Sequence, residues 1–188
     1  MAADVGPERP IFTIGHSTRT LGELIGLLRE AGVDLLVDVR SFPRSRANPQ
    51  FNIEALPAAL AAAGVDYRHV KDLGGRRGRQ DLGRPSPNGF WRSASFRNYA
   101  DFALTPPFRA ALAELLGVGR KHTCAIMCAE AAWQRCHRQI IADWLLAAGV
   151  DVRHIVDAGR IEPARLNPGA EVLPDAAVTY PAPQRQLL

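Results

Sequence analysis

The chain contains 188 residues, carries a formal net charge of +4 at pH 7, and 47% of its residues are hydrophobic. This length and composition fit one domain with a sizeable core. No stretch is apolar for long enough to cross a bilayer, which excludes a membrane-spanning protein, and three cysteines are too few for a disulfide framework. Residues 1–10 lack the basic and apolar regions of a signal peptide, so we expect a cytoplasmic protein with no membrane partner.

The first third of the chain alternates strand and helix patterns. A short apolar run at 11–14 predicts a strand, and the capping-box pair Thr20 and Glu23 then opens a helix that runs to about Glu30. The continuous apolar run at 34–39 predicts a strand that is buried on both faces. The elements that follow are a polar loop at 40–52, an Ala-rich helix to about residue 63, and a strand at 65–70.

The rest of the chain continues this alternation around one long irregular segment. Residues 71–92 contain five glycines and two prolines, and a loop of that length inside a compact domain is usually functional or disordered. The patterns that follow predict helices at 93–104, 107–116 and 133–148, and strands at 123–128 and 152–156. Residues 157–160 predict a turn into a small hairpin at 161–166, and we expect the tail from residue 167 to be loosely held.

The order of these elements predicts an α/β fold, a three-layer sandwich with a mainly parallel sheet of about five strands and a small C-terminal hairpin. We divide the chain into an N-terminal tail at 1–10, a single α/β domain at 11–166 and a Pro-rich C-terminal tail at 167–188. Sheets of this class bind ligands in the crevice beyond the carboxyl ends of their strands. The residues just after each predicted strand are therefore the candidates for a functional site.

The passage from Cys128 to Arg138 carries the most reactive groups. Cys128 ends a predicted strand, and the N-terminus of the next helix would direct its partial positive charge at the thiol, which lowers the pKa of a cysteine. Helical spacing places His137 on the inward face beside Cys136, and Glu130 could orient His137 or act as an acid or base. The same residues also fit a buried structural core. We predict Cys128, Glu130 and His137 as catalytic residues and Arg138 as a substrate-binding residue.

Two familiar sites come close to this passage without matching it. Phosphatases with a Cys-x5-Arg loop cradle one phosphate with loop amides and the arginine, but here Arg135 lies one position too far from Cys128, and a glutamate between them would repel the ligand. A zinc ion could draw on Cys128, Cys136, His137 and His16, but neither CxxC nor HxxxH spacing is present. We predict no metal ligands and keep a metal-dependent hydrolase as an alternative.

Polar groups also follow the first two predicted strands. Asp38 and Arg40 come at the end of the second strand, before a loop with basic and hydroxyl-bearing residues that suits an anionic substrate. Asp38 could equally form an ion pair that holds this loop. His16 and Ser17 follow the first strand and could supply a general base or a hydrogen-bond donor. We predict His16 and Asp38 as catalytic residues, and Ser17, Arg40 and Ser45 as substrate-binding residues.

Positive charge is concentrated in residues 66–97, which carry eight basic and three acidic side chains. Within this segment the loop at 73–79 combines glycines with arginines that we expect to be exposed, and aromatic residues follow it. Such a loop can close over a nucleotide or track a nucleic-acid backbone, or it can simply be a solvated surface. It lacks the GK[ST] ending of a P-loop. The substrate-binding residues predicted here are Gly74, Gly75, Arg76 and Tyr99.

Several of these motifs together resemble a known family. They are TIGHS at 13–17, VDVRSFPRS at 37–45, Tyr67, the Leu-Gly-Gly at 73–75, Tyr99, and CAE at 128–130 followed by CHR at 136–138. The combination resembles the domain-of-unknown-function family 488, over residues from about 11 to 166. The resemblance implies one compact cytosolic α/β domain and implies no particular reaction.

The site residues lead to one main hypothesis and two alternatives. The main hypothesis is an enzyme that acts on a phosphate- or nucleobase-bearing substrate, with Cys128 as the reactive thiol and Glu130 and His137 as acid and base. The groups that would hold the anion are Arg40, Arg138 and the loop at 76–79. The alternatives are a non-catalytic nucleotide or nucleic-acid binding module and a metal-dependent hydrolase. We expect an anionic small molecule or a nucleic acid as partner, and the cofactor and the oligomeric state stay open.

Overall fold

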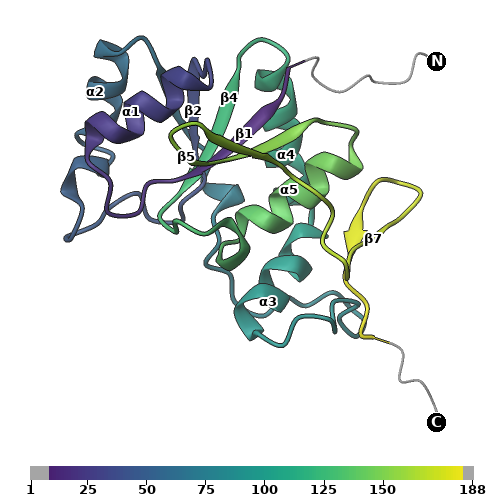
Figure 1. The fold of residues 1–188 in the computed structure, drawn as a ribbon. Coiled ribbons are helices and arrows are strands. Elements are labelled where there is room, and N and C mark those ends of the chain that lie inside the picture. The colour runs from purple at the N-terminus through teal and green to yellow at the C-terminus, as the bar shows by residue number, and fades with distance from the viewer. Residues whose placement is uncertain (1–8, 184–188) are drawn as a thin grey trace.

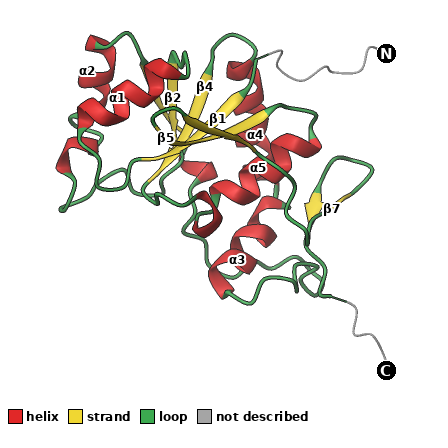
Figure 2. Ribbon diagram, viewed as in Figure 1, coloured by secondary structure: helices red, strands yellow, loops and turns green. Residues whose placement is uncertain are grey.

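A six-stranded sheet forms the centre of the fold, with helices on both faces (Figure 1, Figure 2). The computed structural model describes residues 9–183. The strands are β1 (Ile11–Gly15), β2 (Leu35–Asp38), β3 (Asp66–His69), β4 (Cys124–Cys128), β5 (Val152–Asp157) and β6 (Arg160–Pro163). Their order in the sheet is β3-β2-β4-β1-β5-β6, and only β6 runs antiparallel to its neighbour. The predicted mainly parallel sheet is confirmed, with a sixth strand at its edge.

The central strands are buried on both faces, which explains their continuous apolar sequences. Successive residues of a strand point to opposite faces, so Leu36 belongs to the core cluster on one side, with Leu24 and Leu60, while Val37 belongs to the cluster on the other side, with Phe108. The helices that supply these layers are α1 (Leu21–Glu30), α2 (Leu56–Ala62), α3 (Ala94–Ala103), α4 (Pro106–Gly119) and α5 (Arg138–Ala147). The predicted three-layer α/β sandwich is therefore confirmed.

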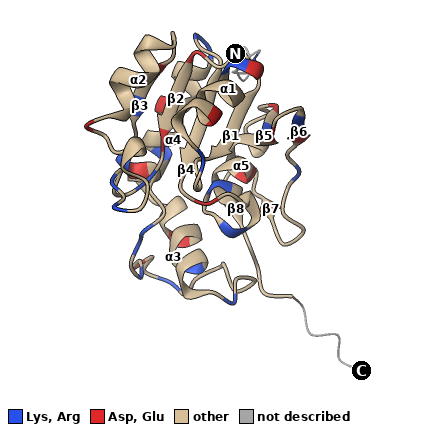
Figure 3. Cartoon of the chain, turned by 60° about the vertical axis from the view of Figure 1, so that its left-hand side comes forward, with Lys and Arg blue, Asp and Glu red and all other residues tan. Residues whose placement is uncertain are grey.

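Local signals set the start of α1 and the course of the long loop. Thr20 Oγ1 accepts from the Glu23 amide at 3.2 Å, and the Glu23 carboxylate accepts from the Thr20 amide at 2.6 Å, as the capping-box pattern predicts. Between β3 and α3 the chain forms a 3-10 turn at Lys71–Leu73 and then no further regular structure until α3. Figure 3 shows the basic residues spread along this connection.

The C-terminal segment differs from the prediction in two ways. The region expected to form its own hairpin instead adds β6 to the main sheet, and the small hairpin consists of β7 (Glu171–Val172) and β8 (Val178–Thr179). The expectation of a loosely held tail is wrong for residues 167–183. Val178 and Tyr180 are fully buried in the core, and the Tyr180 hydroxyl donates to Asp143 on α5 at 2.7 Å. Val178 and Tyr180 pack against α5. The segment that carries them is too short to show a periodic pattern in the sequence.

No helix among residues 9–183 combines the length and the apolar character that crossing a membrane requires.

Candidate functional site

A pocket of about 450 Å³ opens where the carboxyl ends of β1, β2 and β4 meet. This is the edge at which parallel α/β sheets bind ligands. Within residues 9–183, the pocket is lined by one acidic residue, Glu130, and by four arginines, Arg40, Arg44, Arg76 and Arg135. The pocket is therefore basic, although the charge of the whole chain is modest.

The structure brings most of the predicted site residues to this pocket. Those that line it are His16, Arg40, Ser45, Gly75, Arg76, Tyr99, Cys128, Glu130 and His137. Four predicted residues do not line it: Gly74, Asp38 and Arg138 lie behind its wall, and Ser17 lines a separate depression nearby. Lining residues that the prediction missed are Ser41, Phe42, Arg44, Ser95, Phe96, Ala129, Arg135 and Cys136. Arg44 and Phe42 stand in the loop after β2 that the prediction had already marked as basic.

Asp38 holds Arg40 in place and does not face the pocket. Its carboxylate accepts from Arg40 Nε at 2.9 Å and Arg40 Nη2 at 2.6 Å, and it also accepts from the Tyr67 hydroxyl at 2.7 Å. Both Asp38 and Arg40 are buried, so the pair is a fixed ion pair in a dry environment. This is the loop-holding role that the sequence left open, and we assign Asp38 to positioning rather than to catalysis.

His16 also contacts Arg40. Its Nδ1 donates to the Ser17 carbonyl at 2.9 Å, because a carbonyl can only accept, and this leaves Nε2 to accept from Arg40 Nη1 at 3.3 Å. Burial, followed by the charge of Arg40, lowers the pKa of His16 even though the Ser17 carbonyl opposes the shift. The ring also stacks on Phe51 at 4.4 Å. His16 is thus a neutral acceptor at the wall of the pocket.

The helix after β4 begins later than predicted. A 3-10 turn at Trp133–Arg135 precedes it, and α5 starts at Arg138 with His137 at its N-cap position. The predicted start of this helix is therefore wrong, and the first helical amide, that of Arg138, donates to Cys136 Sγ at 3.5 Å. The turn instead carries Cys136 back to the end of β4, so that Cys128 and Cys136 together form one wall of the pocket.

Arg138 is a buried cation whose partners include both sulfurs. Its side chain donates through Nε to Cys128 Sγ at 3.0 Å and to Cys136 Sγ at 3.4 Å. Its Nη atoms donate to Thr13 Oγ1 at 3.3 Å and to the Glu130 carbonyl at 2.6 Å. Within residues 9–183 no carboxylate accepts from this guanidinium. Arginine stays protonated in proteins, and a buried charge needs a partner of opposite sign, so an ionised thiol is the natural counter-ion.

The two thiols are not equivalent. Burial raises the pKa of Cys128 well above its usual range, and its hydrogen bond to Cys136 adds to that shift. Burial also opposes ionisation of Cys136, but hydrogen bonds from Cys128 and His137 and the charge of Arg138 lower the pKa of Cys136 well below its usual range. The sequence assigned the reactive thiol to Cys128; the environment favours Cys136 as the thiolate and Cys128 as its thiol neighbour.

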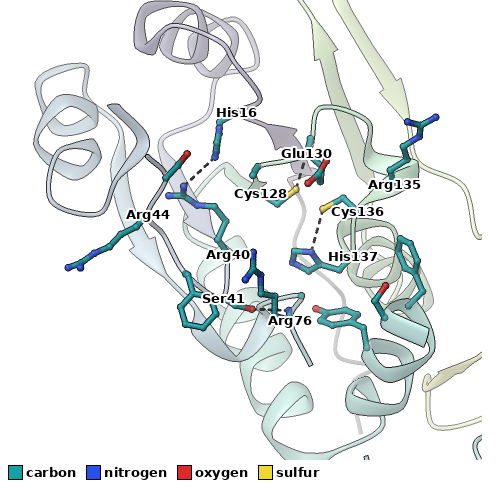
Figure 4. A pocket seen from close by; sticks show the side chains of 17 residues that line it. His16, Arg40, Ser41, Arg44, Arg76, Cys128, Glu130, Arg135, Cys136 and His137 are labelled. Atoms are coloured by element: carbon teal, nitrogen blue, oxygen red, sulfur yellow. Dashed lines mark hydrogen bonds between the residues drawn. The ribbon is translucent and has the colours of Figure 1, made fainter. Parts of the chain in front are cut away.

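His137 lies against the Cys136 sulfur. Its Nε2 donates to the Val39 carbonyl at 2.9 Å, so Nδ1 is the atom that faces Cys136 Sγ, at 3.4 Å. In the neutral pair the thiol donates to Nδ1, and in the charged pair Nδ1–H donates to the thiolate. Figure 4 shows the two sulfurs and the His137 ring facing one space, with the Arg76 side chain reaching toward it.

Thr13 and His154 orient Arg138 on the side away from the pocket. Since Thr13 Oγ1 accepts from Arg138, its own proton goes to His154 Nδ1, at 2.7 Å. Burial, followed by the charge of Arg138, lowers the pKa of His154 to about 4, which keeps this ring a neutral acceptor. The ring of Trp133 stacks on His154 at 4.1 Å. The guanidinium is thereby fixed on the side away from the pocket.

Glycines allow the loop after β3 to approach the site closely. A side chain on Gly75 would put its Cβ 2.4 Å from His137 Nδ1, and one on Gly74 would come 2.5 Å from Ser41 Oγ and 2.8 Å from its Cα. The Tyr99 hydroxyl donates to the Leu73 carbonyl at 2.7 Å and holds the same loop. Tyr99 is almost fully buried, so its predicted contact with substrate becomes mainly a positioning role.

The arginines of this loop do not behave alike. The guanidinium of Arg77 lies 3.8 Å from the centre of the Phe102 ring and donates to the Gly74 carbonyl at 3.0 Å, so Arg77 is part of the structure. The expectation of uniformly exposed arginines is wrong at this position. Arg76 is exposed, lines the pocket, and lies over the ring of Phe42, which is itself 64% exposed at the rim. Arg79 is exposed but does not line the pocket.

The residues considered for zinc do not assemble a site. Among residues 9–183 no group of three or more His, Cys, Asp or Glu side chains is placed to hold a metal ion. His16 is turned to Arg40, while the two sulfurs are turned to Arg138. The metal-dependent alternative therefore lacks its ligand set in this part of the chain.

Fold and site together define a class: a three-layer α/β domain with a buried arginine–dithiol centre in a basic pocket at the strand ends. A protein-family model described as "Domain of unknown function DUF488" matches residues 20–145, which is more than half of the chain. The chain belongs to this family, as the motifs suggested. No curated protein matches the chain, and no solved structure does.

Proposed function

We propose that this protein is an enzyme that acts on a phosphate- or nucleobase-bearing substrate through the thiolate of Cys136. One observation carries the proposal: Arg138 is 1% exposed and contacts two thiols, with no carboxylate among its partners in residues 9–183. A purely structural arginine would be neutralised more cheaply by a carboxylate, as Arg40 is by Asp38. The thiol pair supports a reactive centre instead.

The surrounding groups fit nucleophilic chemistry. A thiolate beside an imidazole is the usual activated cysteine pair, because the imidazole can take the thiol proton and later return it. His137 stands in that relation to Cys136. Among the described residues, Glu130 is the only carboxylate on the pocket wall. It is exposed there, so it can exchange protons with a leaving group or with water.

Exposed arginines of the pocket supply the means to bind an anion. Arg76 and Arg135 are both exposed on its wall, and arginine forks match phosphate geometry. The exposed ring of Phe42 and the half-buried ring of Phe96 offer surfaces on which a base could stack. These features favour a nucleotide over an apolar ligand.

The second candidate is a non-catalytic nucleotide or nucleic-acid binding module that uses the same pocket. The observation in its favour is the burial of the sulfurs: Cys128 and Cys136 are each only 2% exposed. In that case the thiolate would serve only as the counter-ion of Arg138, and the arginines at the rim would carry the function.

Calorimetric titration with mononucleotides and with inorganic phosphate, combined with product analysis, tests both candidates. Wild-type protein should bind at least one nucleotide and convert it. Arg76→Ala should weaken binding about tenfold or more, because a charge-assisted hydrogen bond is worth about 1.5–3 kcal/mol. Arg79→Ala is the matched control, since Arg79 lies in the same loop outside the pocket, and should bind normally.

The cysteine variant separates the two candidates. Cys136→Ala should retain nucleotide binding and lose conversion if the protein is the proposed enzyme. Binding by the wild type without any conversion would favour the binding module. Absence of binding by both nucleotides and phosphate would overturn the proposal itself.

A further inference from the structure

The proposed function leaves one reactive group of the pocket without a role. Cys128 is a thiol rather than a thiolate, yet its sulfur lies 3.0 Å from the same Arg138 Nε that contacts the Cys136 sulfur at 3.4 Å. Contact with one nitrogen atom limits the distance between the two sulfurs to the sum of these values, although the cysteines come from β4 and from the turn before α5. Both cysteines also line the same pocket.

We infer that Cys128 and Cys136 form a peroxide-sensitive redox pair, in which Cys136 is oxidised first and Cys128 then closes a disulfide that switches the pocket off. This inference rests on the proposed function in one respect, the thiolate of Cys136, and adds a modification that regulates the same site. The third cysteine makes a useful contrast. Cys124 lies at the other end of β4, and burial raises its pKa to about 12. Within residues 9–183 its sulfur has a single hydrogen-bond partner, the His122 carbonyl.

The oxidation proceeds in two balanced steps. The Cys136 thiolate attacks one oxygen of hydrogen peroxide: an S–O bond forms, the O–O bond breaks, and hydroxide leaves and becomes water by taking up a proton. Cys136 is now a sulfenic acid and has lost two electrons to the peroxide. The Cys128 sulfur then attacks the Cys136 sulfur: an S–S bond forms, the S–O bond breaks, and the hydroxyl leaves with the Cys128 proton as a second water.

Burial in the pocket wall selects for a small oxidant. Each sulfur is 2% exposed, so a bulky reagent has poor access, whereas hydrogen peroxide is close to water in size. The charge of Arg138 favours attack because it holds Cys136 as the thiolate, which is the reactive form toward peroxides.

The same charge makes the disulfide easy to reduce. Once the S–S bond has formed, neither sulfur is an anion, and the guanidinium of Arg138 is buried without a counter-ion. A buried unpaired charge is costly, so the reduced form is stabilised relative to the disulfide. Disulfides with a stabilised reduced form have the less negative reduction potentials of labile or regulatory bonds. The structure therefore favours a reversible switch over a permanent cross-link.

The test uses the full chain in the absence of any nucleotide. Reduced protein is treated with an equimolar amount of hydrogen peroxide, remaining thiols are alkylated after denaturation, and the cysteines are mapped by mass spectrometry. The expected product is a disulfide between Cys128 and Cys136 with Cys124 still a free thiol. Dithiothreitol should restore all three thiols. In Cys128→Ser the reaction should stop at a sulfenic acid on Cys136, which dimedone traps.

Three results would overturn the inference: Cys136 oxidised to sulfinic acid while Cys128 stays free, a disulfide that involves Cys124, or no oxidation of Cys136. Because no substrate is present, these outcomes are independent of nucleotide binding and conversion. Failure of the redox pair with normal conversion would refute this inference alone. Loss of nucleotide binding by reduced wild-type protein would refute the proposed function alone.

Discussion

Two arginines are buried at the edges of the same pocket, and they are neutralised in different ways. Arg40 is paired with the carboxylate of Asp38, which also accepts from Tyr67. Arg138 is paired with sulfurs, one of which must lose a proton before it can balance the charge. The first pair is a carboxylate and a guanidinium joined by several hydrogen bonds, and it fixes a loop. The second pair carries opposite charges only when the thiol has lost its proton, and a group that can gain or lose a proton in this way can react.

This comparison shows why charge alone does not identify a catalytic residue. Asp38 and Cys136 both stand beside a buried guanidinium, but the lone pairs of Asp38 are occupied by strong donors from the protein, and Asp38 does not reach the pocket. Cys136 lines the pocket and has His137 beside it. Access and a proton acceptor distinguish the two positions.

The largest expected effect comes from removing each arginine in turn. Arg40→Met leaves the Asp38 carboxylate buried without its cation, and we expect a loss of about 3–5 kcal/mol in the free energy of unfolding. Arg138→Met should lower the free energy of unfolding by less, because the thiolate can take up a proton and become neutral. Urea unfolding of both variants measures the difference. Equal losses would show that Arg138 is as much a fixed structural ion as Arg40.

A third buried ionisable group, Asp143, has no cation among its hydrogen-bonding partners in residues 9–183. Burial raises the pKa of Asp143 to about 6, although the Tyr180 hydroxyl and the Asn167 amide oppose the shift. A carboxyl whose pKa is higher in the folded state contributes stability at low pH that is lost as the pH rises through about 6. We expect the free energy of unfolding to fall by roughly 3 kcal/mol from this group between about pH 4 and pH 7.

Urea titrations at several pH values check this expectation. Asp143→Asn removes the titrating group, so its unfolding free energy should lack that fall when compared with the wild type. Parallel pH profiles for the two proteins would show that Asp143 does not titrate as its surroundings imply.

A smaller effect is expected from the loop that closes the thiol side of the pocket. Gly75→Ala places a methyl group 2.4 Å from His137 Nδ1, and overpacking of this kind costs about 1–3 kcal/mol. Gly78→Ala is the control in the same loop, because nothing lies within 4 Å of its added Cβ. Thermal unfolding should separate the two variants. A neutral Gly75→Ala would mean that the loop can move away from His137 at no cost.

The strands and the position of the pocket could be predicted from the sequence, and the chemistry of the thiols could not. Buried strands show as unbroken apolar runs, and the residues after them meet at one edge whatever the strand order. The stripe from Trp133 onward also fits a continuous helix, because periodicity does not reveal that residues 133–135 form a 3-10 turn. That turn moves Cys136 beside Cys128 and buries Arg138 between them. Which thiol ionises depends on these contacts. The contact of Arg138 with Cys136 joins near neighbours, but the contact with Cys128 depends on how the turn folds back onto β4.

The most direct test of the account is the ionisation of Cys136 itself. Thiolates absorb in the ultraviolet, so a pH titration of absorbance detects them without a reagent that must enter the buried site. Wild-type protein should contain a thiolate at pH values well below about 8.5, which is the pKa of a free cysteine. Cys124→Ala should behave in the same way. Cys136→Ala and Arg138→Met should both lose that signal. A wild-type signal that first rises at alkaline pH, and that is the same in all four proteins, would contradict the assignment of a thiolate as the counter-ion of Arg138.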